Sequence, residues 1–302
     1  MPNAGKSTLF NALVARRLAE TAVRPFTTIE PHEAIVNVPD TNLEELSRLI
    51  SPDETVFANI TFIDIAGLVR GAHQGEGLGN QFLAKIREVD AIVHVVRGFT
   101  DPNIAHVHAT HDVGSINQII EDIEIVNLEL ELGGIKGKPI IYVLNVSEED
   151  LKNKPQIDSL VVKVKEKFGE TLTISAKIEE ELIDLDPVER RDYLRQLGVY
   201  ESGLELLIKK SYLMLNLITF YTIKGGKEVH GWSLMSGKPA IDAAQVVHSD
   251  FARGFIKAEV IEVGELLQSG GWLKAKEAGK VRLEGRDYIV CDRDVMEFKV
   301  GS

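Results

Sequence analysis

The first eight residues, Met1-Pro2-Asn3-Ala4-Gly5-Lys6-Ser7-Thr8, hold the most chemically specific pattern in the chain. Gly5-Lys6-Ser7 matches the closing half of a phosphate-binding loop, in which backbone N–H groups surround phosphate oxygens. Lys6 would reach the terminal phosphates, and the Ser7 hydroxyl would ligate Mg²⁺. The apolar spacing of residues 7–14 predicts a helix directly after the loop, and a helix N-terminus favours bound anions. Because G-K-S alone also occurs by chance, the prediction depends on the rest of the chain.

The phosphate-loop pattern is incomplete on its N-terminal side. The full pattern, G-x-x-x-x-G-K-[ST], requires a glycine just before Met1, and a buried strand ahead of that glycine anchors the loop. Neither feature precedes Met1 in the sequence. We therefore expect that a short native N-terminal segment is missing from it.

Two further segments suit a nucleotide-sensing switch. Prolines flank Thr27 and Thr28 in the stretch 24–31, which predicts an extended loop rather than a helix. Residues 59–63 have a strand pattern that runs into Asp64-Ile65-Ala66-Gly67. An aspartate at the end of an apolar strand, followed by a glycine, is typical of a Mg²⁺-binding aspartate beside a mobile switch. D-x-x-G is a weak signal by itself, but here it follows both a G-K-S and a strand.

Residues 71–80 form a glycine-dense loop directly after this motif. Gly75, Gly77 and Gly79 superficially suggest a dinucleotide fingerprint, but the spacing differs and no strand immediately precedes them. A glycine-rich segment beside a phosphate-sensing aspartate suits a rearrangement when the γ-phosphate leaves. An ordinary flexible surface loop is the alternative.

Strand and helix patterns alternate up to about residue 216. Strand patterns cover residues 33–38, 90–96, 139–144 and 171–174, and an amphipathic helix pattern covers residues 116–132. The last two strands lead into Asn145-Val146-Ser147-Glu148 and Ser175-Ala176-Lys177. Polar motifs at the carboxyl ends of strands that alternate with helices predict an α/β fold with a doubly wound parallel sheet.

The pattern changes from residue 217 onward. Short strand patterns at 220–223, 228–232, 255–261 and 288–291, separated by glycine-rich turns, surround a helix pattern at 241–247. We therefore predict a first domain over residues 1–216 and a separate α+β domain over residues 217–302.

Composition limits the class of protein. The 302 residues allow two domains, and 44% hydrophobic with 26% charged residues is typical of a soluble globular protein. No apolar run approaches the roughly 20 residues of a membrane span, and no signal peptide precedes the loop. The single cysteine, Cys291, excludes an internal disulfide and a Cys-based zinc site; it fits a reducing cytoplasm, and a small apolar strand residue is its ordinary role. The net charge of −12 falls within residues 1–218, so an RNA partner would have to be met by a local patch.

The order of the motifs, each at a strand end, matches the five nucleotide motifs of the GTPase superclass. The amino-acid sequences of these motifs closely resemble those of the Obg-like ATPase (YchF) family, and the resemblance covers nearly the whole chain. The segments that carry it are residues 25–31, 64–72, 75–83, 248–256 and 276–282. It implies a Ras-like P-loop NTPase domain followed by a TGS domain, which is a ubiquitin-like β-grasp module, and a cytoplasmic, ribosome-associated regulatory ATPase. The family carries a long helical hairpin after the helix that matches residues 116–132, whereas residues 131–136 close that gap here, so the insertion has been lost or omitted.

The fourth motif predicts the choice of base. GTPases use N-K-x-D, whose aspartate accepts two hydrogen bonds from guanine; here Glu148 takes the aspartate position and Val146 the lysine position. The longer glutamate moves the carboxylate by about one methylene, so the guanine bonds should be lost or misaligned. In the family this altered motif accompanies a preference for ATP over GTP. The expected nucleotide-binding residues are Asn3, Ala4, Gly5, Lys6, Ser7, Thr8, Asn145, Val146, Glu148, Ser175, Ala176 and Lys177.

Catalysis must differ from that of Ras-type enzymes, which orient the attacking water with a glutamine directly after D-x-x-G. Leu68 occupies that position and can neither donate nor accept a hydrogen bond. The resemblance suggests His106 as a substitute, with His73 as a rival, although a single histidine is more often structural. Asn3 matches the asparagine that ligates K⁺ in related cation-activated GTPases, where K⁺ stabilises charge in the transition state. The expected catalytic residues are Lys6, Gly67 and His106.

The resemblance also implies a magnesium site and leaves two functions open. Ser7, Thr28 and Asp64 should surround one Mg²⁺, Asp64 through water, because Mg²⁺ takes oxygen ligands and keeps several waters. A slow ATPase switch that docks on the ribosome in one nucleotide state is the first hypothesis. The second is a nucleotide-gated ribosome- or RNA-binding protein with incidental hydrolysis, which Leu68 favours. A small-molecule kinase is disfavoured because the sequence shows no evident acceptor pocket.

Overall fold

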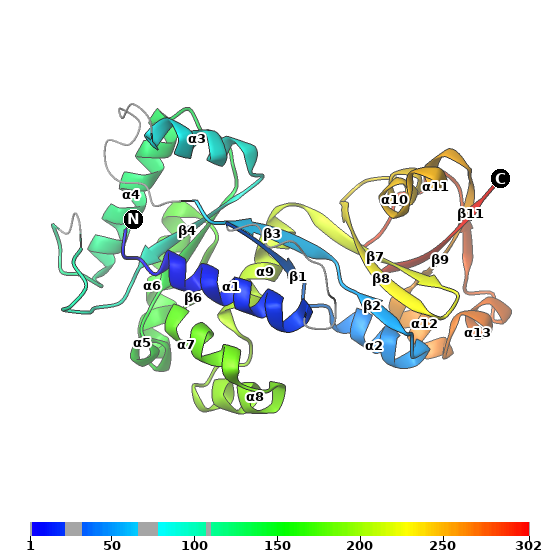
Figure 1. Ribbon diagram of the computed structural model, residues 1–302, viewed down its shortest axis with the longest axis horizontal. Coiled ribbons are helices and arrows are strands. Elements are labelled where there is room, and N and C mark those ends of the chain that lie inside the picture. Colours follow the sequence, from blue (N-terminus) through cyan, green and yellow to red (C-terminus); the bar gives the residue numbers. More distant parts are fainter. Residues whose placement is uncertain (1, 22–31, 66–77, 107–109, 302) are drawn as a thin grey trace. The chain divides into compact units, whose positions relative to one another are not determined.

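The computed structural model describes residues 2–21, 32–65, 78–106 and 110–301, and the chain divides into two compact units (Figure 1). The N-terminal unit comprises Met1–Val36 and Thr61–Ser211, and the C-terminal unit comprises Asn37–Ile60 and Tyr212–Ser302. The C-terminal unit therefore includes a segment from early in the chain. The linear division predicted at residue 216 does not anticipate this segment.

A parallel sheet of three strands lies in the N-terminal unit: β4 (Ile92–Arg97), β5 (Ile140–Asn145) and β6 (Thr171–Ile174). Ile92 pairs with Ile140, and Tyr142 pairs with Thr171. Strands β1 (Glu33–Asn37) and β3 (Asn59–Ile63) pair with each other separately. The predicted strands are confirmed to within two residues at their ends, and the carboxyl ends of β5 and β6 lead into the two predicted motifs.

The α-helices that begin in this unit are α1 (Lys6–Thr21), α3 (Leu78–Glu88), α4 (Ile116–Leu132), α5 (Glu148–Lys152), α6 (Lys154–Phe168), α7 (Ala176–Glu181), α8 (Pro187–Gln196) and α9 (Gly203–Met214). Apolar side chains of α3, α4 and α6 pack on the sheet. Ile119 and Ile123 of α4 and Val164 of α6 are fully buried in one core cluster with Val96 and Leu144 of the sheet. Ser115 begins α4 as its N-cap, because its hydroxyl accepts from Gln118 N at 3.3 Å. In the part of the chain that the structure describes, no helix has the length and apolarity needed to cross a membrane.

A compact turn joins α4 to β5. Ile135 N donates to Leu130 O at 2.9 Å, and Gly134 has φ 75°, a left-handed conformation that ends helices. Arg87 of α3 donates to Gly133 O at 2.8 Å. Residues 133–139 therefore connect helix and strand directly, and no helical hairpin lies between them.

The C-terminal unit is built on a sheet of six strands in the order β10 (Arg282–Glu284), β9 (Phe255–Glu262), β11 (Asp294–Val300), β7 (Leu217–Lys224), β8 (Glu228–Met235) and β2 (Glu54–Val56). Strands β7 and β8 form an antiparallel hairpin, and the last strand, β11, lies between β7, to which it is parallel, and β9, to which it is antiparallel. The other helices are α2 (Thr41–Ile50), α10 (Ala240–Val247), α11 (Ser249–Arg253), α12 (Val263–Ser269) and α13 (Trp272–Glu277).

One predicted strand of this unit is wrong. Residues 288–291 form no strand; Ile289 makes an isolated bridge to Pro239, and Cys291 is exposed rather than packed in a strand. The carboxylate of Asp294 explains the local course of the chain, because it accepts from Cys291 N at 2.9 Å and from the Tyr288 hydroxyl at 2.8 Å. The sequence patterns also missed β2, β10 and β11.

Residues 37–60 join the C-terminal unit through a buried face of α2. Leu43 and Leu46 are fully buried in a core cluster with Tyr221 and Val229. Asp40 caps α2 through Asn42 N and Leu43 N, and its second carboxylate oxygen accepts from the Tyr221 hydroxyl at 2.8 Å. Together with the pairing of β2 on β8, these contacts explain why the segment belongs to this unit.

Candidate functional site

Residues 3–5 of the predicted phosphate loop turn directly into α1. Asn3 and Gly5 have φ of 60° and 88°, and Leu9 N donates to Gly5 O at 3.0 Å at the start of α1. A Cβ on Gly5 would lie 2.1 Å from Asn145 Nδ2, so both the conformation and the space require glycine. Ala4 is buried, whereas Ser7 is exposed in the first turn of the helix and Thr8 follows it there.

Lys6 and Asp64 meet in an ion pair between Nζ and Oδ1. Asp64 directly follows β3, and its backbone N–H donates to His32 O at 2.8 Å. The structure therefore brings together the predicted phosphate-binding lysine and the predicted metal-binding carboxylate, next in sequence to Ser7. Thr28 and Gly67, the other predicted metal and catalytic residues, lie outside the described residues, as do Leu68 and His73.

The donor chemistry of this site suits magnesium. The carboxylate of Asp64 and the hydroxyl of Ser7 are oxygen donors, which Mg²⁺ prefers, and phosphates and water supply its other ligands in nucleotide sites. Within the described ranges there is no cluster of three or more His, Cys, Asp or Glu side chains that could hold a metal. A nucleotide-bound Mg²⁺ does not need such a cluster, because one or two protein carboxylates suffice.

Asn145 ties two of the predicted motifs together. Its Nδ2 donates to Ala4 O at 2.9 Å, and its Oδ1 accepts from Ala176 N at 2.9 Å. The side chain is buried at the carboxyl end of β5, so these two bonds are made away from water. Asn145 therefore connects the phosphate loop to the Ser175-Ala176-Lys177 motif, a role that the motif pattern alone did not reveal.

The remaining residues of the predicted base site are divided between core and surface. Val146 is buried in the core, and Ser175 is buried at the start of α7. Glu148 begins α5, where its carboxylate accepts from Lys152 Nζ at 2.7 Å, and this ion pair holds the pKa of Glu148 below its usual range. Lys177 is exposed and is a weaker electrostatic neighbour of the same carboxylate.

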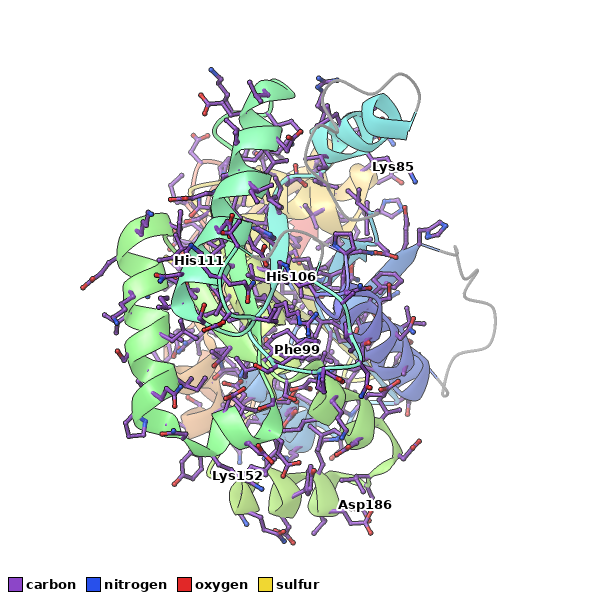
Figure 2. All side chains as sticks on the ribbon, turned by 90° about the vertical axis from the view of Figure 1, so that its left-hand side faces the viewer. Lys85, Phe99, His106, His111, Lys152 and Asp186 are labelled. Atoms are coloured by element: carbon purple, nitrogen blue, oxygen red, sulfur yellow. The ribbon has the colours of Figure 1, made fainter. Side chains whose placement is uncertain are left out.

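His106 lies on the loop between β4 and α4, where Figure 2 labels it with Phe99 and His111. Its Nε2 is 2.9 Å from Asp122 Oδ2, and the imidazole is only 6% exposed. The neighbouring carbonyl, Ala105 O, accepts from Asn3 Nδ2 at 3.1 Å. The residue that precedes the predicted catalytic histidine is therefore bonded to the phosphate loop, while the imidazole itself contacts α4.

Arg97 anchors this loop from the end of β4. Its guanidinium is buried and donates to the carbonyl oxygens of Phe99, Asp101, Ile104 and Ala105. Burial lowers the pKa of Arg97 from its ordinary value, while Asp101 and Asp122 counteract that effect. Sequence reasoning missed Arg97, Gln118 and Asp122; the signal for the last two was a pair of polar residues four apart within an apolar helix pattern.

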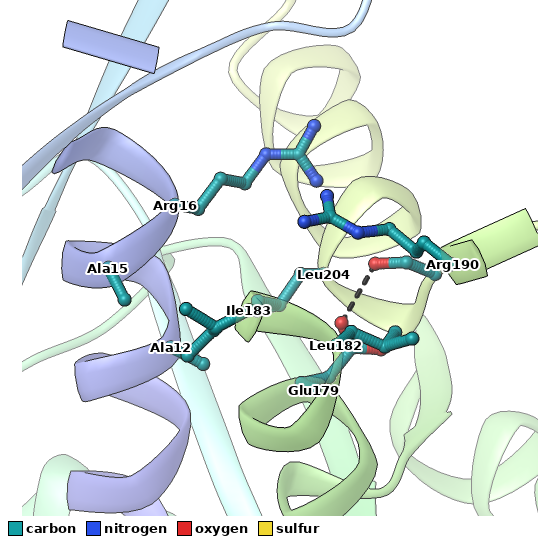
Figure 3. A pocket seen from close by; sticks show the side chains of 9 residues that line it. Ala12, Ala15, Arg16, Glu179, Leu182, Ile183, Arg190 and Leu204 are labelled. Carbon is teal, nitrogen blue, oxygen red and sulfur yellow. Dashed lines mark hydrogen bonds between the residues drawn. The ribbon is translucent and has the colours of Figure 1, made fainter. Parts of the chain in front are cut away.

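A small pocket lies between α1, α7 and α8, away from the phosphate loop. Figure 3 shows the guanidinium groups of Arg16 and Arg190 pointing toward each other on one side of it. Buried Glu179 lies on the other side and accepts from Ser202 Oγ at 2.8 Å and from Gly203 N at 2.7 Å, which caps α9; burial raises the pKa of this carboxyl. Its lining on α1 begins at Ala12, six residues after Lys6, so this pocket is not the phosphate site.

Two family models match the chain. A model described as 50S ribosome-binding GTPase matches residues 1–146, and a model named YchF-GTPase_C, described as a protein of unknown function (DUF933), matches residues 217–301. The ribosome-binding ATPase YchF of Bacillus subtilis (strain 168) is 40% identical over 363 residues, covering 99% of this chain and 97% of the relative. The protein of the same name from Escherichia coli O157:H7 is 37% identical over 358 residues, covering 99% and 96%.

The solved structures support the same relationship. The Schizosaccharomyces pombe YchF GTPase is similar with a TM-score of 0.81 and 29% identity, over 99% of this chain and 96% of that one. A GTP-binding protein from Pyrococcus horikoshii OT3 shares the fold, with a TM-score of 0.63 and 18% identity over 99% and 98% of the two chains. These matches confirm the predicted α/β P-loop domain followed by a C-terminal domain. Because the Bacillus alignment spans 363 residues and this chain has 302, that relative has residues without a counterpart here, in agreement with the direct turn at residues 133–139.

Proposed function

The chain belongs to the YchF family of P-loop NTPases, and from this premise we propose that it hydrolyses ATP better than GTP and acts as a ribosome-binding switch. The observation that carries the proposal is the convergence of Lys6, Asp64 and Asn145 on the phosphate loop. The names of the relatives, which call them ribosome-binding ATPases, support ATP as the substrate and the ribosome as the partner. We extend the proposal to a cytoplasmic location, where ribosomes and ATP occur together.

Phosphate binding would use the loop backbone and Lys6. Backbone N–H groups of residues 4–8 would donate to phosphate oxygens at the N-terminus of α1, and Lys6 would exchange its contact with Asp64 for the terminal phosphates. When bound, Mg²⁺ would neutralise developing charge on the phosphate oxygens, held by Ser7 and Asp64 and by the predicted third ligand, Thr28. Asp64 would then accept from metal-bound water instead of from Lys6.

Base recognition would depend on the loop that follows β5. Glu148 stands where GTPases place the aspartate that accepts from guanine, and its present partner is Lys152. The longer side chain and this ion pair both weaken the case for guanine recognition, which supports the preference for ATP. Ser175, Ala176 and Lys177 would line the opposite side of the base.

Water activation would depend on His106 and on a K⁺ ion ligated by Asn3. Leu68 cannot orient water, whereas His106 directly follows Ala105, whose carbonyl accepts from Asn3 Nδ2. When bound, K⁺ would add positive charge beside the phosphates, with the Asn3 amide oxygen as its ligand. We propose that the histidine holds or senses the attacking water.

The second candidate function is a nucleotide-gated ribosome- or RNA-binding protein in which hydrolysis is incidental. The observation that favours it is Leu68 in the place of the usual glutamine. In this case nucleotide would only order the binding surface, and ribosome binding would follow nucleotide occupancy rather than turnover.

Single-turnover hydrolysis of Mg²⁺-ATP in K⁺ and in Na⁺ separates these two functions. We expect wild-type protein to react faster in K⁺, and Asn3→Ala to lose that advantage while it still binds nucleotide. His106→Ala should slow the chemical step by about 10²-fold with little change in ATP affinity. Equal rates in the two salts together with an unimpaired His106→Ala variant would favour the binding protein over the ATPase.

A further inference from the structure

We propose that Asp122 is a positioning residue for hydrolysis, which fixes the orientation and the tautomer of His106. The inference rests on the role proposed above for His106 and adds a residue that lies outside the nucleotide motifs. Asp122 lies in the second turn of α4 and accepts from His106 Nε2 at 2.9 Å.

Asp122 is held by a buried network. Its exposed fraction is 1%, and that of Gln118, one turn earlier on α4, is 0%. Gln118 Nε2 donates to Asp122 Oδ2 and, at 3.3 Å, to Arg97 O, while Gln118 Oε1 accepts from Gly114 N at 2.8 Å. The carboxylate therefore has a fixed position relative to the end of β4 and to the start of α4.

Packing alone does not account for this carboxylate. Taking an ionised carboxylate out of water costs several kcal/mol, so buried carboxylates are normally paired or functional. Here the oxygen that contacts His106 also accepts from Gln118, and the buried guanidinium of Arg97 offsets the negative charge from nearby. An apolar residue would fill the same space on α4 without that cost, but it could not orient the imidazole.

The contact determines which ring nitrogen carries a proton. A carboxylate oxygen accepts, so Nε2 must be the protonated nitrogen in the neutral ring, and Nδ1 carries the lone pair. The Asp122 contact therefore fixes the tautomer of the neutral imidazole as well as its orientation. In such a pair, the carboxylate acts through the histidine and does not itself meet the substrate.

The loop between β4 and α4, which carries His106, is also hydrogen-bonded to the phosphate loop. Asn3 Nδ2 donates to Ala105 O at 3.1 Å, and Arg97 donates to the same carbonyl at 3.3 Å. His106 is thus held on one side by Asp122 and, through the preceding carbonyl, by the loop that would hold the phosphates. Loss of the Asp122 carboxylate should remove the bond to His106 Nε2 and leave the bond from Asn3 to Ala105 O in place.

The test compares Asp122→Asn with Glu124→Gln, a carboxylate-to-amide change at an exposed position of α4 that pairs with Lys167. We expect Asp122→Asn to slow single-turnover ATP hydrolysis by about 10²-fold or more, with ATP affinity within about threefold of wild type. Asp122→Glu should recover part of the rate because it keeps a carboxylate, and the Glu124→Gln control should react at the wild-type rate. In the double variant with His106→Ala, Asp122→Asn should cause no further loss, because both changes disable one unit.

A second measurement needs no folded Asp122 variant. Long-range ¹H–¹⁵N spectra of wild-type protein report the imidazole tautomer, with His106 assigned by its absence in His106→Ala. We expect Nε2–H in the wild type. An Nδ1–H tautomer, or a wild-type hydrolysis rate for Asp122→Asn, overturns the inference even if His106→Ala is slow. If His106→Ala hydrolyses ATP at the wild-type rate, the proposed role of His106 fails and the inference fails with it.

Discussion

Replacement of Asn145 by alanine should separate the phosphate loop from the Ser175-Ala176-Lys177 motif. The change removes two buried bonds, to Ala4 O and from Ala176 N, both of 2.9 Å. A buried hydrogen bond contributes about 1 kcal/mol net, and partners left unsatisfied raise the cost, so we expect a loss of about 2–4 kcal/mol in unfolding free energy. For a unit of this size the thermal midpoint of its transition should fall by about 4–10 °C.

The same change should weaken ATP binding, because the Ala4 carbonyl in the phosphate loop loses its hydrogen bond from Asn145 Nδ2. We expect affinity for a fluorescent ATP analogue to fall at least about tenfold, a difference of about 1.4 kcal/mol. Asn127→Ala is the control, since Asn127 also bonds through its amide, to the Tyr142 hydroxyl at 3.0 Å, but lies on α4 away from both motifs. It should lower stability without loss of ATP affinity. If the affinity of Asn145→Ala for ATP is within twofold of wild type, the two hydrogen bonds of Asn145 do not hold the phosphate loop in its binding conformation.

Three further predictions concern the loop, the core and the base. Gly5→Ala should abolish ATP binding in a fluorescence titration, because φ is 88° and the new Cβ would lie 2.1 Å from Asn145 Nδ2; retained affinity would contradict the loop geometry. Burial lowers the pKa of His94 from 6.5 to about 3, so its contribution to stability is present above pH 6.5 and is lost as the pH falls, when the unfolded chain takes up the proton. When the pH is lowered from 7.5 to 5, the unfolding free energy measured with urea should fall by about 2 kcal/mol more for the wild type than for His94→Phe. Equal decreases in the two proteins would count against a neutral buried ring. In competition binding, Glu148→Asp combined with Val146→Lys should shift preference toward GTP, and wild-type binding of GTP tenfold tighter than ATP would refute the base assignment.

The positions of the phosphate loop and of the strands that carry the site could be predicted from the sequence alone. G-K-S before a helix pattern indicated the phosphate loop, and apolar runs that end in polar motifs indicated strands whose carboxyl ends carry the site. These features depend on neighbouring residues, so β5, β6 and α4 have the predicted positions to within one residue. The order of the motifs indicated the GTPase superclass, and the residues of five segments indicated the family.

Tertiary structure decided what joins these elements. Asn145 is separated from Ala4 by 141 residues, so no local pattern could show that its amide connects the phosphate loop to Ala176. Asp122 resembled an ordinary polar residue of an amphipathic helix until the fold buried it against His106.

In the C-terminal unit, too, contacts between distant segments determined the structure. Residues 37–60 appeared to belong to the first domain because they lie early in the chain, yet Leu43 and Leu46 find their apolar partners on β7 and β8. Residues 288–291 had a strand composition, but the carboxylate of Asp294 bonds the chain there into a turn. Helix and strand patterns record which side chains must leave water, whereas the partners that cover them are determined only when distant segments meet.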